Sequence, residues 1–219
     1  MTYTLSESDS KAILAPFGVT FLPEILVASP EEARSGVSTM SGPFAAKLCG
    51  DHVAHKSERG LVRLGLIDAD AVASATVDLL AAARPEDEAT GVLIAPMASG
   101  LREFIAGVSL DPVFGLTIAF GLGGVLAEAL ADVSIRLAPI AQSDAFDMFD
   151  SLRTSSLFDE FRGEPAIDRN ALADVLMGLS NAAASIDGLV SIDLNPLMIC
   201  DGVPIALDAL VELEGRYEF

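Results

Sequence analysis

Residues 188–197 read Gly188-Leu189-Val190-Ser191-Ile192-Asp193-Leu194-Asn195-Pro196-Leu197, an apolar run that carries an acid and an amide. A second strand-like run, at 204–210, contains Asp208, thirteen residues after Asn195. Hard cations such as Mg²⁺ take carboxylate and amide oxygens as ligands. If the two strands are neighbours, Asn195 and Asp208 would hold such a metal and leave coordination positions open for phosphate. The stretch therefore predicts a metal site of the kind that a nucleotide-using enzyme needs.

The rest of the chain alternates helical and strand-like patterns, with no long linker and no internal repeat. A helix is expected from about residue 7 to before Pro16, because proline pushes the preceding residue out of helical angles. A second helix should begin at Pro30, with Ser29 as its cap and acids in its first turn. Apolar periodicity predicts further helices at 70–83, 143–152 and 168–186. The expected strands are 19–28, 44–49, 60–67, 91–95, 102–109, 116–120, 132–137, 189–195, 197–200 and 204–210.

These patterns predict an α/β fold, of the α+β kind, in two lobes. The boundary is expected near Ala95. Residues 1–95 would form an N-terminal lobe with a short leading helix, and residues 96–219 a C-terminal lobe that carries the metal site. A chain of 219 residues is long enough to bury an ample core in this arrangement.

The chain is 51% hydrophobic, which raises the question of a membrane protein. Its longest uncharged run, between Asp111 and Glu128, contains four glycines and is too short for the roughly 20 apolar residues of a span. The first residues have no basic cap and no long apolar segment, so no signal peptide is expected. Cys49 and Cys200 are isolated and lack metal or redox spacing. We therefore expect a soluble, cytoplasmic protein with no membrane partner.

The formal net charge is −19, from 32 acidic residues against 13 lysines and arginines. Such a field repels nucleic-acid phosphates, so a nucleic-acid partner is not expected. A phosphate ligand would have to be held locally, by a few placed cations, backbone N–H groups and a metal. The acidity itself is most simply explained by solubility.

Lys47 lies within an apolar strand-like run, Phe44-Ala45-Ala46-Lys47-Leu48-Cys49. A lysine at such a position either extends to a sheet edge or points into a cleft toward a phosphate. The chain has only three lysines, and the pattern alone does not decide between these two interpretations.

His55 stands in the polar run His55-Lys56-Ser57-Glu58-Arg59-Gly60. A loop histidine is most often a surface residue. The alternative is a nucleophile, because neutral imidazole, with an unperturbed pKa of about 6.5, can accept and release a phosphoryl group. In that case Lys56, Ser57 and the Gly60 backbone could steady the phosphate.

A glycine-rich turn follows the expected strand at 116–120, as Phe120-Gly121-Leu122-Gly123-Gly124. It lacks the Lys-Ser/Thr of a P-loop, so a tight turn between packed strands is the better interpretation. Arg136 lies in the apolar strand at 132–137, where its guanidinium would need an anionic partner.

Taken in order, these segments resemble the ATP-grasp domain of NDP-forming acyl-CoA synthetases, that is, the β subunit of ADP-forming acetyl-CoA synthetase, a relative of the succinyl-CoA synthetase β chain. The resemblance runs nearly from end to end. It is carried by Leu5-Ser6-Glu7, Ala46-Lys47-Leu48, His55-Lys56-Ser57, Asp111-Pro112-Val113-Phe114-Gly115, Phe120-Gly121-Leu122-Gly123-Gly124, Asp132-Val133-Ser134-Ile135-Arg136-Leu137, Phe161-Arg162-Gly163-Glu164-Pro165, Asp193-Leu194-Asn195-Pro196-Leu197 and Leu207-Asp208-Ala209.

The resemblance implies an ATP-grasp fold with ATP or ADP bound in a cleft between the two lobes. It assigns roles as follows: Lys47 to the nucleotide phosphates, Ala95 and Met97 to a hinge that offers backbone groups to adenine, Glu103 to the nucleotide, Arg136 to charge neutralisation, and Asn195 and Asp208 to Mg²⁺. Asp193 would be either a nearby ligand or the carboxylate that orients a phosphohistidine. At the hinge, Pro96 lacks an N–H, so the backbone at this position cannot donate a hydrogen bond to adenine.

The implied reaction interconverts acyl-CoA, ADP and phosphate with carboxylate, CoA and ATP, and His55 would receive the phosphoryl group and pass it to ADP. The CoA-binding part would come from a separate α subunit, in an assembly expected to be a heterotetramer. Two alternatives stay open: a nucleotide-binding module that regulates or scaffolds a partner without turnover, and an ATP-grasp ligase that joins a carboxylate to an amine.

Overall fold

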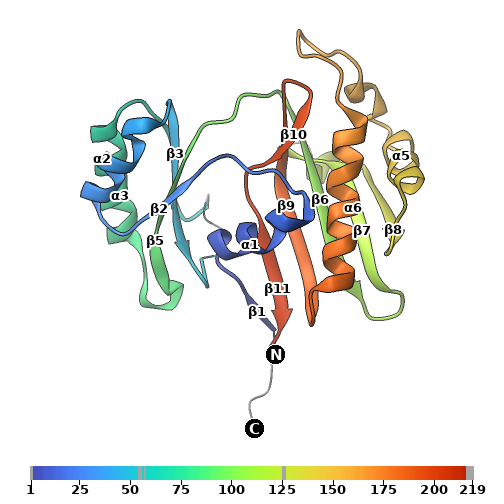
Figure 1. Cartoon of the computed structure of the whole chain (residues 1–219), viewed down its shortest axis with the longest axis horizontal. Helices are drawn as coiled ribbons and strands as arrows, with labels where there is room; N and C mark the ends of the chain where they lie inside the picture. The colour runs from blue at the N-terminus through green and yellow to red at the C-terminus, as the bar shows by residue number, and fades with distance from the viewer. Residues whose placement is uncertain (1, 54–55, 57, 125–126, 216–219) are drawn as a thin grey trace. The chain divides into compact units, whose positions relative to one another are not determined.

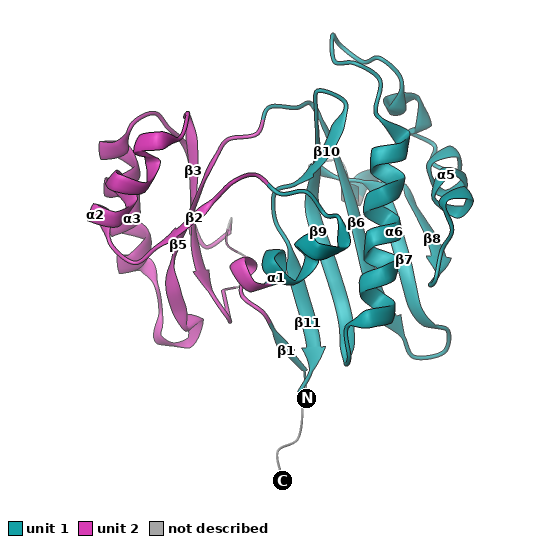
Figure 2. Ribbon diagram, viewed as in Figure 1, with its two compact units in different colours: residues 1–4, 10–21, 99–219 teal, residues 5–9, 22–98 magenta. Residues whose placement is uncertain are grey.

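The computed structural model in Figure 1 describes residues 2–53, 56, 58–124 and 127–215. Its internal contacts divide the chain into two compact units, coloured in Figure 2. Unit 1 comprises residues 1–4, 10–21 and 99–219, and unit 2 comprises residues 5–9 and 22–98. Helix α1, Glu7–Leu14, belongs to unit 2 up to Asp9 and to unit 1 from Ser10. Each unit is built on its own sheet.

In unit 1 the described residues form a seven-stranded sheet in the order β1-β11-β9-β6-β7-β8, with β10 also paired to β9. All of its named pairs are antiparallel. Its strands are β1 (Thr2–Thr4), β6 (Arg102–Asp111), β7 (Gly115–Leu122), β8 (Val133–Leu137), β9 (Leu189–Cys200), β10 (Val203–Ala206) and β11 (Leu210–Glu214).

Helices α5 (Gln142–Asp150) and α6 (Arg169–Ser185) cover one face of this sheet (Figure 1). Alternate residues of β6 and β7 point to that face and are buried, as a strand's period of two requires. Phe104 and Phe120 stack there with ring centroids 5.2 Å apart, and Phe149 of α5 meets Phe120 edge-on at 5.1 Å. The aromatic cluster therefore fixes which face of the sheet is core and which is open. Shorter helical segments of the unit are η1 (Ala15–Phe17), α4 (Ala127–Leu130) and η5 (Ser155–Phe158).

Unit 2 has a four-stranded sheet in the order β2-β5-β3-β4, with helices α2 and α3 packed on it. Ser29 caps α2 as predicted, because its Oγ accepts the N–H of Glu32 at 3.2 Å. The core between sheet and helices includes Ala46, Leu48 and Val92. The elements are β2 (Ile25–Val27), α2 (Pro30–Gly36), η2 (Val37–Thr39), β3 (Phe44–Gly50), β4 (Val62–Leu66), α3 (Ala69–Ala82), η3 (Pro85–Asp87) and β5 (Ala89–Pro96).

Four predicted strands differ from the observed ones. The single strand expected at 19–28 is a bridge at Phe21 and the short strand β2, because Pro23 between them cannot donate to a ladder. The two strands expected at 189–195 and 197–200 are one strand, β9. The strand expected at 204–210 is two, β10 and β11, separated by residues 207–209.

The contacts also group the N-terminal residues differently from the lobes 1–95 and 96–219 of the sequence analysis. The change from unit 2 to unit 1 falls between Ala98 and Ser99, and residues 10–21 belong with the C-terminal part. Strand β1 pairs with β11, and Phe21 bridges Ala206, which accounts for this grouping. No helix within the described part of the chain is long and apolar enough to cross a membrane.

Candidate functional site

Asn195 of β9 lies opposite Asp208, which is in the short segment 207–209 between β10 and β11. Strand β9 pairs with β10 on one side of this point and with β11 on the other. The flanking register pairs are Leu197↔Ala206 and Asp193↔Leu210. Continuing this register by two residues from either pair sets Asn195 opposite Asp208. Between them and the first pair, the N–H of Leu207 donates to the carbonyl of Pro196 at 3.0 Å. The structure therefore brings the two predicted metal ligands together.

A β-bulge in β9 includes Asn195. On the β6 side the register shifts between Phe104 and Ala106, so that Ile105 faces two residues of β9. Bulges of this kind redirect a side chain and are frequent beside active sites. Asp193 and Asn195 are exposed, and they alternate with buried residues of the core face. Both side chains therefore belong to the open face of the sheet, opposite α5 and α6.

Asp193 is electrostatically linked to Asp208. Although Asp193 as a residue is exposed, protein atoms around its carboxyl remove enough water to raise its pKa, and the charge of Asp208 raises it further. Two carboxylates and an amide are all hard oxygen donors, which suits Mg²⁺ and not a softer metal. Among the described residues no group of three or more His, Cys, Asp or Glu is arranged to hold a metal. Protein oxygens at this point would thus complete a coordination shell only together with other oxygens, such as those of phosphates.

Glu103 shares the open face with Asp193. On β6 it alternates with the buried Phe104, in phase with Gly107, which is the register partner of Asp193. Its carbonyl accepts the N–H of Gly123 at 2.8 Å. A Cβ at Gly124 would come within 3.0 Å of Glu103 Oε2, so this carboxylate lies against the glycine turn.

The glycines at 123 and 124 follow β7, and the chain continues to α4 before it reaches β8, so they do not join two strands directly. Gly123 has no space for a side chain, because a Cβ there would lie 2.8 Å from the backbone of Phe104. Gly124 has a φ of 71°, in the left-handed region that favours glycine.

Arg136 does not join this group. It pairs with the buried Ile118, whereas its neighbour Ile135 is in register with Ala119 and, through it, with Gly107 on the open face. Arg136 therefore lies on the helix-covered face, where it donates to Ser134 Oγ at 3.3 Å and to the carbonyl of Ile135 at 3.0 Å. Within the described residues no carboxylate lies within ion-pair distance of it. None of the described carboxylates is therefore the anionic partner expected from the sequence, and Arg136 lies on the opposite face of the sheet from Asp193.

Lys47 of β3 lies on the face of the unit 2 sheet that α2 and α3 leave uncovered, in register with Leu93 and Val62. Its Nζ donates to Oε1 of Glu7 at 2.8 Å. Lys56 Nζ donates to the other carboxylate oxygen of Glu7. The sequence analysis missed Glu7, which it treated only as the start of a helix.

The predicted hinge residues end β5. Ala95 is the register partner of Ala45 in β3, inside the ladder. The N–H of Met97 donates to the carbonyl of Pro43 at 2.8 Å, and Met97 Sδ accepts the N–H of Gly65 at 3.0 Å. Since Met97 already uses its N–H within the protein and Pro96 has none, an adenine ring would have to use carbonyl groups here.

His55 lies outside the described residues, but the structure shows what holds the chain on either side of it. Arg59 donates to both oxygens of Asp87, at 2.7 and 2.8 Å, and the N–H of His52 donates to the Asp87 carbonyl at 3.3 Å. The hydrogen bond from Arg59 lowers the pKa of Asp87 to about 2, against the opposing effect of desolvation. The N–H of Leu61 donates to the carbonyl of Lys56 at 2.7 Å. Described residues on either side of His55 are thus held by hydrogen bonds to other parts of the chain.

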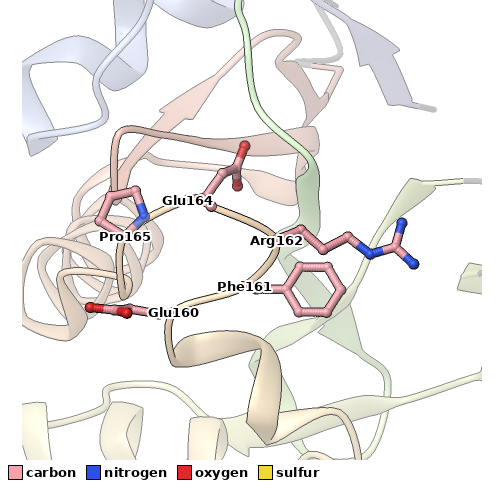
Figure 3. Close-up of a pocket in the computed structure, with 6 residues that line it drawn as sticks. Glu160, Phe161, Arg162, Glu164 and Pro165 are labelled. Carbon is pink, nitrogen blue, oxygen red and sulfur yellow. The ribbon is translucent and has the colours of Figure 1, made fainter.

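A surface hollow of about 450 Å³ lies at residues 160–165 (Figure 3). The Arg162 side chain extends away from Glu164 and over the Phe161 ring, 5.4 Å from its centroid. Glu164 instead binds the buried Arg102 and the N–H of Leu101. Glu164 therefore holds this loop in place as a structural turn.

A family model described as ATP-grasp domain matches residues 1–213. The chain belongs to the ATP-grasp family. The β subunit of acetate–CoA ligase (ADP-forming) I of Pyrococcus furiosus is 34% identical over 209 residues, which are 94% of this chain and 90% of that protein. Within the family, the chain is therefore of the β-subunit type of the ADP-forming acyl-CoA synthetases, which are acid–thiol ligases.

Two solved structures of acetyl-coenzyme A synthetase 1 from Ca. Korarchaeum cryptofilum show the same fold. One, in complex with coenzyme A and Ca-AMPCP, has a TM-score of 0.91 and 30% identity, and covers 97% of this chain and 94% of its own. The other holds coenzyme A and Mg-AMPPCP, with its phosphohistidine segment pointing towards the nucleotide binding site. It has a TM-score of 0.81 and 29% identity, and covers 95% of this chain and 92% of its own. The two-sheet ATP-grasp fold predicted from the sequence is confirmed.

Proposed function

We propose that this chain performs the nucleotide half of an acyl-CoA synthetase reaction: acyl-CoA, ADP and phosphate give carboxylate, CoA and ATP, and the reverse. The observation that carries the proposal is the register of β9 with β10 and β11, which sets Asn195 opposite Asp208 on an open sheet face. The likeness to the Korarchaeum structure with bound Mg-AMPPCP supports it.

Asn195 and Asp208 would hold Mg²⁺, because an amide and a carboxylate oxygen match its preference for hard ligands. The ion supplies neutralisation of charge on the transferred phosphoryl group. Asp193, two residues from Asn195 on the same face, would be either a further ligand or the group that orients the histidine. Glu103 would contact the nucleotide from the same face.

Lys47 would contact the nucleotide phosphates, since an ammonium group is a compact charge suited to phosphate. His55 would accept the phosphoryl group at an imidazole nitrogen from a phosphohistidine of the partner subunit, whose N–P bond breaks, and would transfer it to ADP. Imidazole suits this because it can be both nucleophile and leaving group near neutral pH. Most of the catalysis would then come from positioning and charge neutralisation.

The remaining half of the reaction would need a CoA-binding α subunit. The Pyrococcus furiosus relative is itself a β subunit, which supports a partner of this kind. A heterotetramer is the assembly that we propose. The chain alone would bind nucleotide but would not form a CoA thioester.

The test is co-expression with a CoA-binding subunit, followed by an assay of nucleotide-dependent CoA thioester formation. The His55→Ala complex should bind Mg·ATP but form neither thioester nor an acid-labile phosphoryl group on this chain. His52→Asn is the matched control, because His52 is exposed and is the only other histidine. A His55→Ala complex that keeps full activity would favour an amine ligase or a regulatory module instead.

A further inference from the structure

Glu7 is a buried carboxylate that two lysines share. Its side chain is 1% exposed, while those of Lys47 and Lys56 are 19% and 12% exposed. Lys47 Nζ bonds to Oε1 at 2.8 Å, and Lys56 Nζ bonds to Oε2. The whole chain has three lysines, so two of them converge on one acid.

Counted by themselves, these three groups carry one excess positive charge, in a strongly acidic protein. Two ammonium groups and one carboxylate sum to +1, in a chain whose net charge is −19. Burying ions is costly, and apolar residues can often replace a buried ion pair without loss of stability. A second lysine on the same carboxylate therefore calls for an explanation beyond holding α1 in place.

We propose that Glu7 is a positioning residue for phosphate binding, which fixes the ammonium groups of Lys47 and Lys56 beside each other so that both contact the nucleotide phosphates. The inference rests on the proposed function, in which Lys47 binds those phosphates, and adds Lys56 as a second phosphate ligand. Each ammonium has three donors, and Glu7 takes one from each. A lysine stem fixed before binding loses less conformational entropy when the ligand arrives.

An effect of net charge alone and a positioning role of Glu7 predict opposite changes in nucleotide affinity for Glu7→Gln. If only net charge mattered, removing the carboxylate would change the cluster from +1 to +2 and tighten binding of an anion. If Glu7 positions the lysines, the variant binds more weakly despite the added positive charge, because both stems lose their anchor.

The experiment measures Mg·ADP affinity of the full chain by isothermal titration calorimetry. Glu7→Gln should bind about tenfold more weakly or worse. Glu31→Gln is the control, since it makes the same change at an exposed acid in the first turn of α2 and should bind as the unaltered chain does. Equal or tighter binding by folded Glu7→Gln overturns the inference and leaves the proposed function intact. Absence of Mg·ADP binding by the unaltered chain overturns both.

A second comparison uses a double variant, Lys56→Met/Glu7→Gln, in which these three positions sum to +1 as they do in the unaltered chain. In Lys56→Met alone they sum to 0, so the double variant carries one more positive charge than this single variant. It should nevertheless bind Mg·ADP several-fold more weakly than Lys56→Met, because Lys47 then has no carboxylate to position it. Equal affinities for these two variants, or unfolding of every Glu7→Gln variant by circular dichroism, mean that Glu7 is structural and overturn the inference.

Discussion

The guanidinium of Arg59 donates to both carboxylate oxygens of Asp87, at 2.7 and 2.8 Å, in the segment that follows His55. The pKa of Asp87 falls from 3.8 to about 2 as a result. A lowered carboxyl pKa contributes stability that is fully present above the unfolded pKa and is lost as the pH falls through the folded one. The pair should therefore stabilise unit 2 above about pH 5 and stop doing so between about pH 4 and 2.

Asp87→Asn should lower the free energy of unfolding by about 1–2 kcal/mol at pH 7, after allowance for solvent screening near the surface. The difference from the unaltered chain should shrink toward zero as the pH approaches 2. Urea unfolding at several pH values measures the loss at pH 7 and its decrease at low pH. Asp70→Asn, which removes an exposed ion pair with Arg34, should cost about 0.5 kcal/mol or less. Equal losses in the two variants would contradict the role of the bidentate pair.

Asp208→Asn should remove the Mg²⁺ dependence of nucleotide binding. In the unaltered chain we expect Mg²⁺ to strengthen ADP binding at least about tenfold, through the site opposite Asn195. The variant keeps the shape of the side chain but loses its charge, so Mg²⁺ should no longer strengthen ADP binding appreciably. Titration calorimetry with and without Mg²⁺ measures it. Asp201→Asn, in the β9–β10 turn, is the control, because asparagine tolerates its positive φ of 50°. An unchanged Mg²⁺ dependence in Asp208→Asn would place the metal elsewhere.

Gly178→Ala separates helix propensity from packing in α6. Alanine is favoured over glycine by about 1 kcal/mol in a helix interior. A Cβ at Gly178, however, would collide with the carbonyl oxygen of Phe17 in η1, which cannot move without its backbone. Overpacking of this kind costs about 1–3 kcal/mol, so we expect net destabilisation in thermal unfolding. Asn181→Ala, at an exposed position of the same helix, should be neutral or slightly stabilising. If Gly178→Ala is more stable than the unaltered chain, the backbone of η1 can shift at little cost in free energy.

The pairing of Asn195 with Asp208 could be predicted because it is local. The two strands follow each other along the chain, so antiparallel pairing is the default, and the types of residue indicate the chemistry. The residues at which the strands begin and end were less predictable. The bulge that makes β9 one strand depends on its partner β6, ninety residues away in the sequence, which no local pattern reports.

Two other features depend on contacts between distant residues. An acid in the first turn of a helix is common for electrostatic reasons, so Glu7 carried no signal of the lysine 40 residues away that it binds. Arg136 alternates with apolar neighbours in β8, which predicts two faces but not which one the helices cover. Burial of Ile118 in the next strand decides that Arg136 is on the covered face.

Arg102 and Glu164 provide a further test, because a buried cation depends on this acid. The Arg102 side chain is 1% exposed, and its Nε donates to Glu164 Oε2 at 3.0 Å. Three backbone carbonyls accept hydrogen bonds from its two terminal nitrogens, so each guanidinium nitrogen is hydrogen-bonded, and among the described residues Glu164 is its one counter-charge. Glu164→Gln keeps the size of the side chain and leaves the cation uncompensated.

Removing one partner of a buried ion pair costs about 3–5 kcal/mol, because the other charge stays buried. The backbone carbonyls at Arg102 offset part of this, so we expect Glu164→Gln to lower the free energy of unfolding by about 2–3 kcal/mol. Glu160→Gln is the control on the same loop, where the acid is exposed and its loss should be within about 0.5 kcal/mol. Urea unfolding of both variants at pH 7 makes the comparison. A cost for Glu164→Gln no larger than that of Glu160→Gln would mean that the carbonyl dipoles alone stabilise the guanidinium, and that the 160–165 turn does not owe its shape to this acid.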